Sequence, residues 1–155
     1  HVPEKMRLDA QLVAARTYDA SEYLMRLHRA DDTMLDTDFT GEMFDRITSV
    51  GSGHLTDRHA EFDSRDLLRL TGARVQQIRG TSGVETPWGL RVDNDAVAEE
   101  LAERLARRIA TTSPDVVAAD GDFANAAVSE HIDLTALHPM QIVARAYGVT
   151  GRPRR

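Results

Sequence analysis

The chain has 155 residues, of which 41% are hydrophobic and 28% are charged, and its formal net charge is -6. This composition indicates one folded domain and argues against general affinity for nucleic acid, because phosphate binding requires a basic face. The chain has no cysteine, so it can form neither a disulfide nor a thiolate-ligated zinc or iron–sulfur centre by itself. We expect a single domain with a helical lead-in over residues 1–40, an α/β core over 46–149 and a basic tail over 150–155.

The sequence contains no pattern typical of a membrane span or a secretory signal. A transmembrane helix needs about 20 predominantly apolar residues, and no run in the chain approaches that length. No charged-then-apolar segment opens the chain either. We therefore expect a cytoplasmic protein that does not insert into a membrane.

The amino-terminal part of the chain predicts two helices. The segment EKMRLDAQLVAARTYD follows Pro3, a residue favoured at helix starts, and has an uneven apolar face. The segment ASEYLMRLHRA, residues 20–30, continues with apolar residues at helical spacing. We expect a break or kink near Thr17, and the polar segment DDTMLDTDFTGEM then ends the helical pattern.

Three short apolar runs further along the chain predict strands. Each run is followed by a loop that contains glycine, and the runs with their loops read RITSVGSG, ARVQQIRG and PDVVAADGD. Helical patterns separate these runs, so the order of elements predicts an α/β fold with a small parallel sheet and flanking helices. The loops that follow parallel strands gather at the carboxyl ends of those strands, which is where we expect a functional site.

The boundaries of the predicted helices are marked by capping residues. In SRDLLRLTG we predict Ser64 as the N-cap and Gly72 as the end of the helix. Asp93 or Asn94 can cap the longest amphipathic pattern, which has apolar residues at i, i+4 spacing. Two more helices are expected over FANAAVSEHI and HPMQIVARAYG, the second opened by Pro139.

Three loops carry a resemblance to a known family: SVGSGHL (49–55), GTSGVETPWG (80–89) and AADGDFANAA (118–127). With TYDASEYLMRLH upstream and LHPMQIVARAYG at the end, they resemble the last cysteine-rich (CCG) domain of an iron–sulfur electron-transfer family. That family includes the cysteine-rich chain of heterodisulfide reductase and the iron–sulfur chain of anaerobic glycerol-3-phosphate dehydrogenase. The resemblance spans roughly residues 5–149 and implies a CCG-domain-like fold.

The resemblance also identifies the positions at which cluster ligands are missing. In that family the cysteine thiolates of the three loops bind an iron–sulfur cluster, and here Gly53, Thr81 and Gly121 stand at or next to the ligand positions. Neither glycine nor threonine can replace a soft thiolate. Neighbouring residues of the family pattern are kept, namely His54, Ser82, Gly83, Trp88, Gly89, Asp120 and His138.

A kept scaffold without ligands implies a cluster-less accessory or structural subunit of a heterodisulfide-reductase-like redox complex, acting through protein–protein contacts rather than catalysis. The expected partner is a redox-enzyme subunit or a cluster-bearing relative, which would hold the iron–sulfur cluster, while this chain binds no cofactor. An unpaired half of a two-domain unit should expose apolar surface, so we expect a hetero- or homo-oligomer. The alternative is an electron-transfer subunit of an oxidoreductase complex that uses a cofactor held by a partner chain.

A metal or catalytic site is a third hypothesis. The residues His54, His59, Asp120 and Asp122 offer nitrogen and oxygen ligands of the kind that zinc or iron accepts. In the plainer interpretation they are polar loop residues, with Asp122 capping a helix, Asp120 accepting hydrogen bonds in its turn, and His138 at a helix start. We identify no catalytic residue, because Ser82 lacks the pattern of a hydrolase nucleophile.

Overall fold

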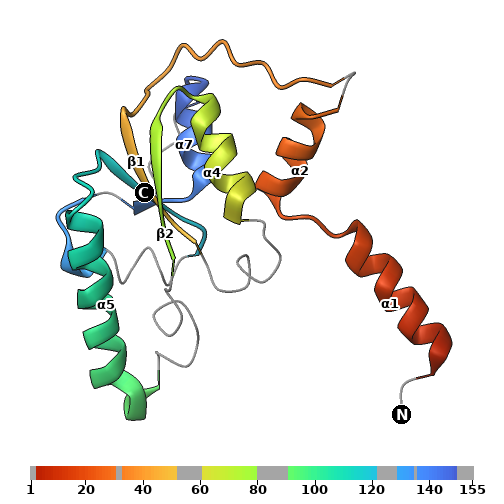
Figure 1. Cartoon of the computed structure of the whole chain (residues 1–155), viewed down its shortest axis with the longest axis horizontal. Helices are drawn as coiled ribbons and strands as arrows, with labels where there is room; N and C mark the ends of the chain where they lie inside the picture. Colours follow the sequence, from red (N-terminus) through yellow and green to blue (C-terminus); the bar gives the residue numbers. More distant parts are fainter. Residues whose placement is uncertain are drawn as a thin grey trace.

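The protein has an α/β fold with a four-stranded, all-parallel sheet in the order β2-β1-β3-β4, flanked by helices (Figure 1). The computed structural model describes residues 3–30, 33–51, 61–79, 91–121, 129–134 and 136–149. The strands are β1 (Arg46–Val50), β2 (Arg74–Ile78), β3 (Val116–Ala119) and β4 (Ala136–Leu137). The predicted parallel sheet is confirmed, and β4 is an addition, because two residues are too few to give a strand pattern.

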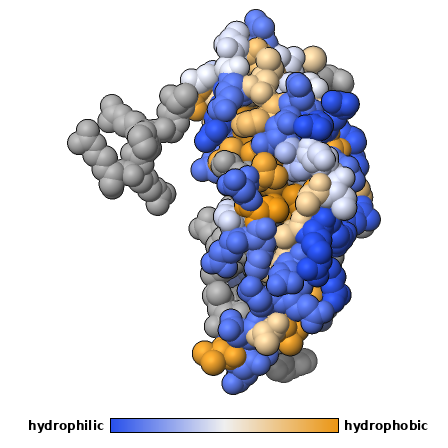
Figure 2. Space-filling model, turned by 90° about the vertical axis from the view of Figure 1, so that its left-hand side faces the viewer, coloured by the Kyte–Doolittle hydropathy of each residue, from blue (hydrophilic) through white to orange (hydrophobic). Residues whose placement is uncertain are grey.

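Helices cover both faces of this sheet (Figure 1). The helices α2, α4 and α7 lie on one face, and α5 lies on the other, while α1 extends away from the sheet. Figure 2 shows the α5 side, where hydrophilic residues cover most of the surface and hydrophobic residues gather in a small area near the middle. The helices are α1 (Glu4–Arg16), α2 (Ala20–His28), α4 (Glu61–Leu70), α5 (Asp95–Ala110, after the 3-10 turn η1, Val92–Asn94) and α7 (Pro139–Ala146).

The core is divided by the sheet into two apolar layers. Successive strand residues point to opposite faces, so Ile47 packs with α4 and α7, whereas Val50 packs with α5. On the α4 side Leu68 is fully buried, and on the α5 side Ile109 is fully buried. Each such side chain contributes roughly 1.5–3 kcal/mol through the water-excluded area, which offsets part of the chain's conformational entropy.

One of the predicted helix starts differs from the structure, and a second agrees with it in position only. The helix α4 begins at Glu61, so Ser64 lies inside the helix and is buried, and its prediction as the N-cap is wrong. The 3-10 turn brings Asn94 to the N-cap position of α5, but its side chain makes no capping hydrogen bond. The predicted end at Gly72 is confirmed, because this residue has φ +86°, a conformation that favours glycine. Of the predicted helix FANAAVSEHI, only residues 129–132 are described, and 129–131 are helical.

The segment 33–45, which we call the strap, runs from α2 to β1 over the end of α7 (Figure 1). Its Gly41 N–H donates to the carbonyl of Ala146 at 2.8 Å, and its Glu42 N–H donates to the carbonyl of Arg145 at 3.0 Å. These bonds satisfy carbonyl groups at the last turn of α7 that have no partner within the helix. A Cβ atom on Gly41 would lie 2.0 Å from the Arg145 carbonyl oxygen, so the strap fits only with glycine at this point.

The helix α1 contrasts with the rest of the molecule because none of its residues is buried. Its four large apolar side chains are all more than half exposed: Met6, Leu8, Leu12 and Val13. Neither α1 nor any other helix of the described residues is long and apolar enough to cross a bilayer.

Candidate functional site: the carboxyl edge of the sheet

The first three strands of the chain end side by side at one edge of the sheet. Val50 at the end of β1 is in register with Ile78 of β2 and with Ala119 of β3. The three segments that follow these strands therefore begin next to one another, as the sequence predicts. After β1 the chain continues to β2 on one side of the sheet, and after β3 it continues to β4 on the other side. In many open α/β sheets, ligands bind between two adjacent strands whose connections diverge in this way.

Most of the site residues predicted from the sequence cannot be located at this edge. Of the predicted set, the structure describes Asp120, Gly121 and His138. The others lie outside the described residues: Gly53, His54, His59, Thr81, Ser82, Gly83, Trp88, Gly89 and Asp122.

Asp120 directly follows β3, and its carboxylate links three elements of the fold. The side chain is only 7% exposed. The Ser64 hydroxyl, on the first turns of α4, donates to Oδ2 of Asp120 at 3.3 Å. The Nε2 atom of His138, at the start of α7, lies 3.6 Å from Oδ1 of the same carboxylate. Asp120 therefore holds α4 and α7 against the end of β3.

His138 acts as the N-cap of α7. Its Nδ1 accepts a hydrogen bond from the N–H of Met140 at 3.1 Å, and Oε1 of Gln141 accepts one from the His138 N–H at 2.9 Å. Because Nδ1 is an acceptor, the proton of the neutral ring is on Nε2, which faces Asp120. The Nδ1 atom of His138 is thus occupied by the backbone of α7, whereas the separation of 3.6 Å between Nε2 and Asp120 Oδ1 is too long for a hydrogen bond. Among the described residues, no group of three or more potential ligands could hold a metal ion.

Gly121 lies beside Asp120 in open space. A Cβ atom built at this position would meet nothing within 4 Å, so sterics do not require glycine here.

A second polar side chain near this edge belongs to Gln77 of β2. It lies on the same face as Val75, toward α4, and is in register with the buried Ser49 of β1. The amide nitrogen and oxygen of Gln77 are buried and have no hydrogen-bond partner among the residues that the structure describes. Sequence reasoning missed both Gln77 and Ser64, although the alternation in RVQQI puts Gln77 on the inner face with Val75.

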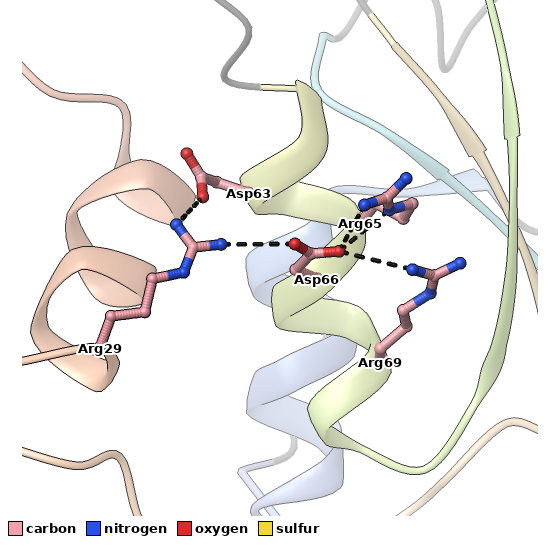
Figure 3. Close-up of polar contacts among 5 residues, drawn as sticks. All are labelled: Arg29, Asp63, Arg65, Asp66 and Arg69. Carbon is pink, nitrogen blue, oxygen red and sulfur yellow. Dashed lines mark hydrogen bonds and ion pairs between the residues drawn. The ribbon is translucent and has the colours of Figure 1, made fainter.

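An ion-pair network fixes α4, which carries Ser64, to the end of α2 (Figure 3). The guanidinium of Arg29 contacts Asp63 at 2.6 Å and Asp66 at 3.3 Å. The Asp66 carboxylate is also contacted by Arg65 at 2.8 Å and by Arg69 at 3.6 Å. Partly exposed pairs are individually weak, but a network that shares one carboxylate restricts the position of the helix.

The opposite, amino edge of the sheet contains an ordinary surface ion pair. The N–H of Arg46 donates to Asp115 Oδ2 at 2.9 Å, and its guanidinium donates to Oδ1 at 3.1 Å. The backbone hydrogen bond from Arg46, followed by the side-chain hydrogen bond, lowers the pKa of Asp115 below its ordinary value of 3.8. The side chains of Arg46 and Asp115 at this edge are 48% and 35% exposed, whereas Ser64 and Asp120 at the carboxyl edge are withdrawn from water.

Comparison with models of protein families, with curated proteins and with solved structures found no match to this chain. What the carboxyl edge can do chemically therefore has to be argued from its residues. Of the described groups there, Ser64, Asp120 and His138 make contacts that connect elements of the fold, the buried Gln77 amide has no partner among the described residues, and the chain has no thiol.

Proposed function

We propose that this chain is a cluster-less accessory subunit of a cytoplasmic, heterodisulfide-reductase-like redox complex, and that it works by docking its carboxyl edge against a cluster-bearing partner. The observation that carries the proposal is the engagement of Asp120 by Ser64 and by His138. This carboxylate lies at the carboxyl edge of the sheet, where a catalytic or ligand-binding group would be expected, but it links β3 to two helices.

The loss of cysteine supports the same conclusion. An iron–sulfur cluster is held by thiolates, and the chain has none, so the iron of the complex would belong to the partner. The parallel sheet and the convergence of the segments after β1, β2 and β3 agree with the family resemblance at the level of fold. A domain that keeps the shape of this edge without its cluster ligands can still bind the partner subunits that recognise that shape.

A second candidate function is electron transfer around a cofactor that a partner chain supplies. The buried amide of Gln77 favours this alternative, because it offers a donor and an acceptor near the carboxyl edge that have no partner within the described ranges. In this case the chain would contribute contacts to the cofactor of another subunit.

The first experiment is to isolate the chain from its own host without oxygen, identify stoichiometric partners by mass spectrometry and assay iron and sulfide in the same fraction. The proposal expects a partner whose own clusters account for all the iron. Iron and sulfide that remain with the separated chain would contradict it.

A matched pair of variants then tests the docking edge with the purified partner. Gly121→Arg projects a large side chain from the carboxyl edge into open space, and we expect it to weaken partner binding at least about tenfold without unfolding the chain. Ala110→Arg adds the same side chain at the exposed end of α5, near the opposite edge, and serves as the control. Equal affinities of the two variants would exclude the carboxyl edge as the docking surface.

A further inference from the structure

An apolar groove lies on the α2, α4 and α7 side of the molecule. Its volume is about 270 Å³. This is below the roughly 300–1,000 Å³ of typical small-molecule sites, so the groove suits a few side chains of a docked helix better than a whole ligand. The strap, α2 and α7 contribute to its lining through Leu24, Leu35, Phe39, Met140, Ala144 and Val149.

The helix α1 offers side chains that match this groove. Leu8, Leu12 and Ala15 recur at i, i+4 and i+7, which places them in one stripe along the helix. The side chains of Leu8 and Leu12 are 55% and 59% exposed. A separate helix of 13 residues is only marginally stable in water, so α1 requires another surface to bury such a stripe.

The junction between α1 and α2 keeps α1 away from the groove of its own chain. The Tyr18 hydroxyl donates to the carbonyl of Ala15 at 3.1 Å, and the Arg26 guanidinium donates to that hydroxyl at 2.5 Å. Arg26 also lies over the Tyr18 ring, and Tyr23 packs beside it. At helical spacing, Arg26 lies on the side of α2 opposite Leu24, which lines the groove.

The charges beside the two surfaces are complementary. Lys5 and Arg16 flank the Leu12 side of the stripe on α1. Asp36 and Asp38 are exposed on the strap and alternate with the groove residues Leu35 and Phe39. Within the described residues, neither of these two carboxylates forms an ion pair, although Oδ1 of Asp36 accepts a hydrogen bond from the N–H of Asp38 at 2.9 Å. Both carboxylates can therefore pair with the two cations of α1, and the groove and this side of the helix agree in polarity.

We propose that the chain forms a symmetric homodimer in which the Leu8–Leu12 stripe of each α1 occupies the groove of the other copy. Each copy then offers one stripe and one groove, and both are filled by the other copy. The assembly therefore stops at a dimer. The inference does not rest on the proposed function, because it uses the α2, α4 and α7 side and leaves the carboxyl edge accessible.

The test is analytical ultracentrifugation of the full chain over a range of concentrations. We expect a dimer for the native sequence, and the double variant Leu8→Glu with Leu12→Glu should raise the dissociation constant at least about a hundredfold. The matched control is Met6→Glu with Val13→Glu, on the opposite side of α1, which should change it less than about threefold. Circular dichroism checks that the variants remain folded.

A mixing experiment locates the second half of the interface. Ala144→Arg blocks the groove and leaves α1 intact, whereas the Leu8→Glu, Leu12→Glu chain keeps its groove. Mixed in equal amounts, the two should form a one-to-one heterodimer that is weaker than the native dimer, because one of the two contacts remains. A monomeric native chain, a native-like dimer of the α1 variant, or the absence of a heterodimer would each overturn the proposal; a monomer would assign the groove to a different protein.

Discussion

The strap and α1 lie on either side of α2 in the amino-terminal part of the chain, and they relate to the sheet in opposite ways. The strap is tied to the end of α7 by backbone hydrogen bonds, by the Arg145–Glu42 ion pair at 3.2 Å and by the contact between the tilted rings of Phe39 and Tyr147. The helix α1 has regular hydrogen bonding of its own but no buried residue. An irregular segment can therefore be an integral part of a fold, while a regular helix of the same chain buries none of its residues against that fold.

The largest expected effect follows from Gly41→Ala. The added Cβ would meet backbone atoms of Arg145 and Gly148, which cannot move as a flexible side chain can, so the strap must separate from α7. We expect a loss of about 3 kcal/mol in the free energy of unfolding, measured by urea denaturation. Gly121→Ala is the control, because its Cβ would enter open space, and it should stay within about 0.5 kcal/mol of the native value. Similar free energies of unfolding for the two variants would show that the strap contributes little to the stability of the fold.

The other end of α7 provides the second test. Asp120→Ala removes the acceptor of the buried Ser64 hydroxyl and the carboxylate that faces His138. We expect a loss of about 1–3 kcal/mol in the same assay, since a buried polar group loses its partner. His138→Asn separates the contributions, because asparagine can still cap α7 but does not reach Asp120 in the same way, and a smaller loss is expected. An unchanged stability of Asp120→Ala would remove the structural role assigned to this carboxylate.

The pH dependence of the strap gives a third, smaller effect. Burial raises the pKa of Tyr147 above its ordinary value of 10.0, and the Asp36 carboxylate raises it further. The folded state thus favours the neutral phenol, whose hydroxyl donates to the Asp36 carbonyl. This contribution is complete below pH 10.0 and is lost as the pH rises through the folded-state pKa. Tyr147→Phe should reduce the alkaline decrease of the melting temperature, and an identical decrease in both proteins would contradict this.

The smallest effect is expected in α1. Val13→Ser changes a side chain that is 67% exposed and lies opposite the Leu8–Leu12 stripe. The free energy of unfolding should change by less than about 0.5 kcal/mol. A loss comparable with that of Gly41→Ala would mean that α1 is part of the folded core after all, and the contrast between the two segments would fail.

The sheet and its connections were predictable because their signals are local. β-branched runs such as RITSV end at glycine-containing loops, and HPMQIVARAYG carries its own start and stop residues in Pro139 and Gly148. The start of α4 was misplaced because Ser64 is a good N-cap residue by type, and only its contact with Asp120 explains why it lies inside the helix.

The strap and the polar link at Asp120 could not be predicted, because both depend on partners that are distant in the sequence. The sequence around Gly41 contains no pattern that predicts its contact with the backbone of Arg145. Asp120 could be placed at the carboxyl edge from the strand pattern, but its contacts come from α4 and α7. The residues of the family pattern that fall outside the described ranges remain sequence predictions.

The bond between Gly41 and Ala146 also bears on the order of folding. It joins positions that are about 100 residues apart, and closing so long a loop is entropically unfavourable until the strands and α7 are in place. We therefore expect the strap to close after the rate-limiting step. Substitutions that weaken the strap should then accelerate unfolding and leave the folding rate almost unchanged. The strap would thus determine the lifetime of the folded state and not the rate at which it forms.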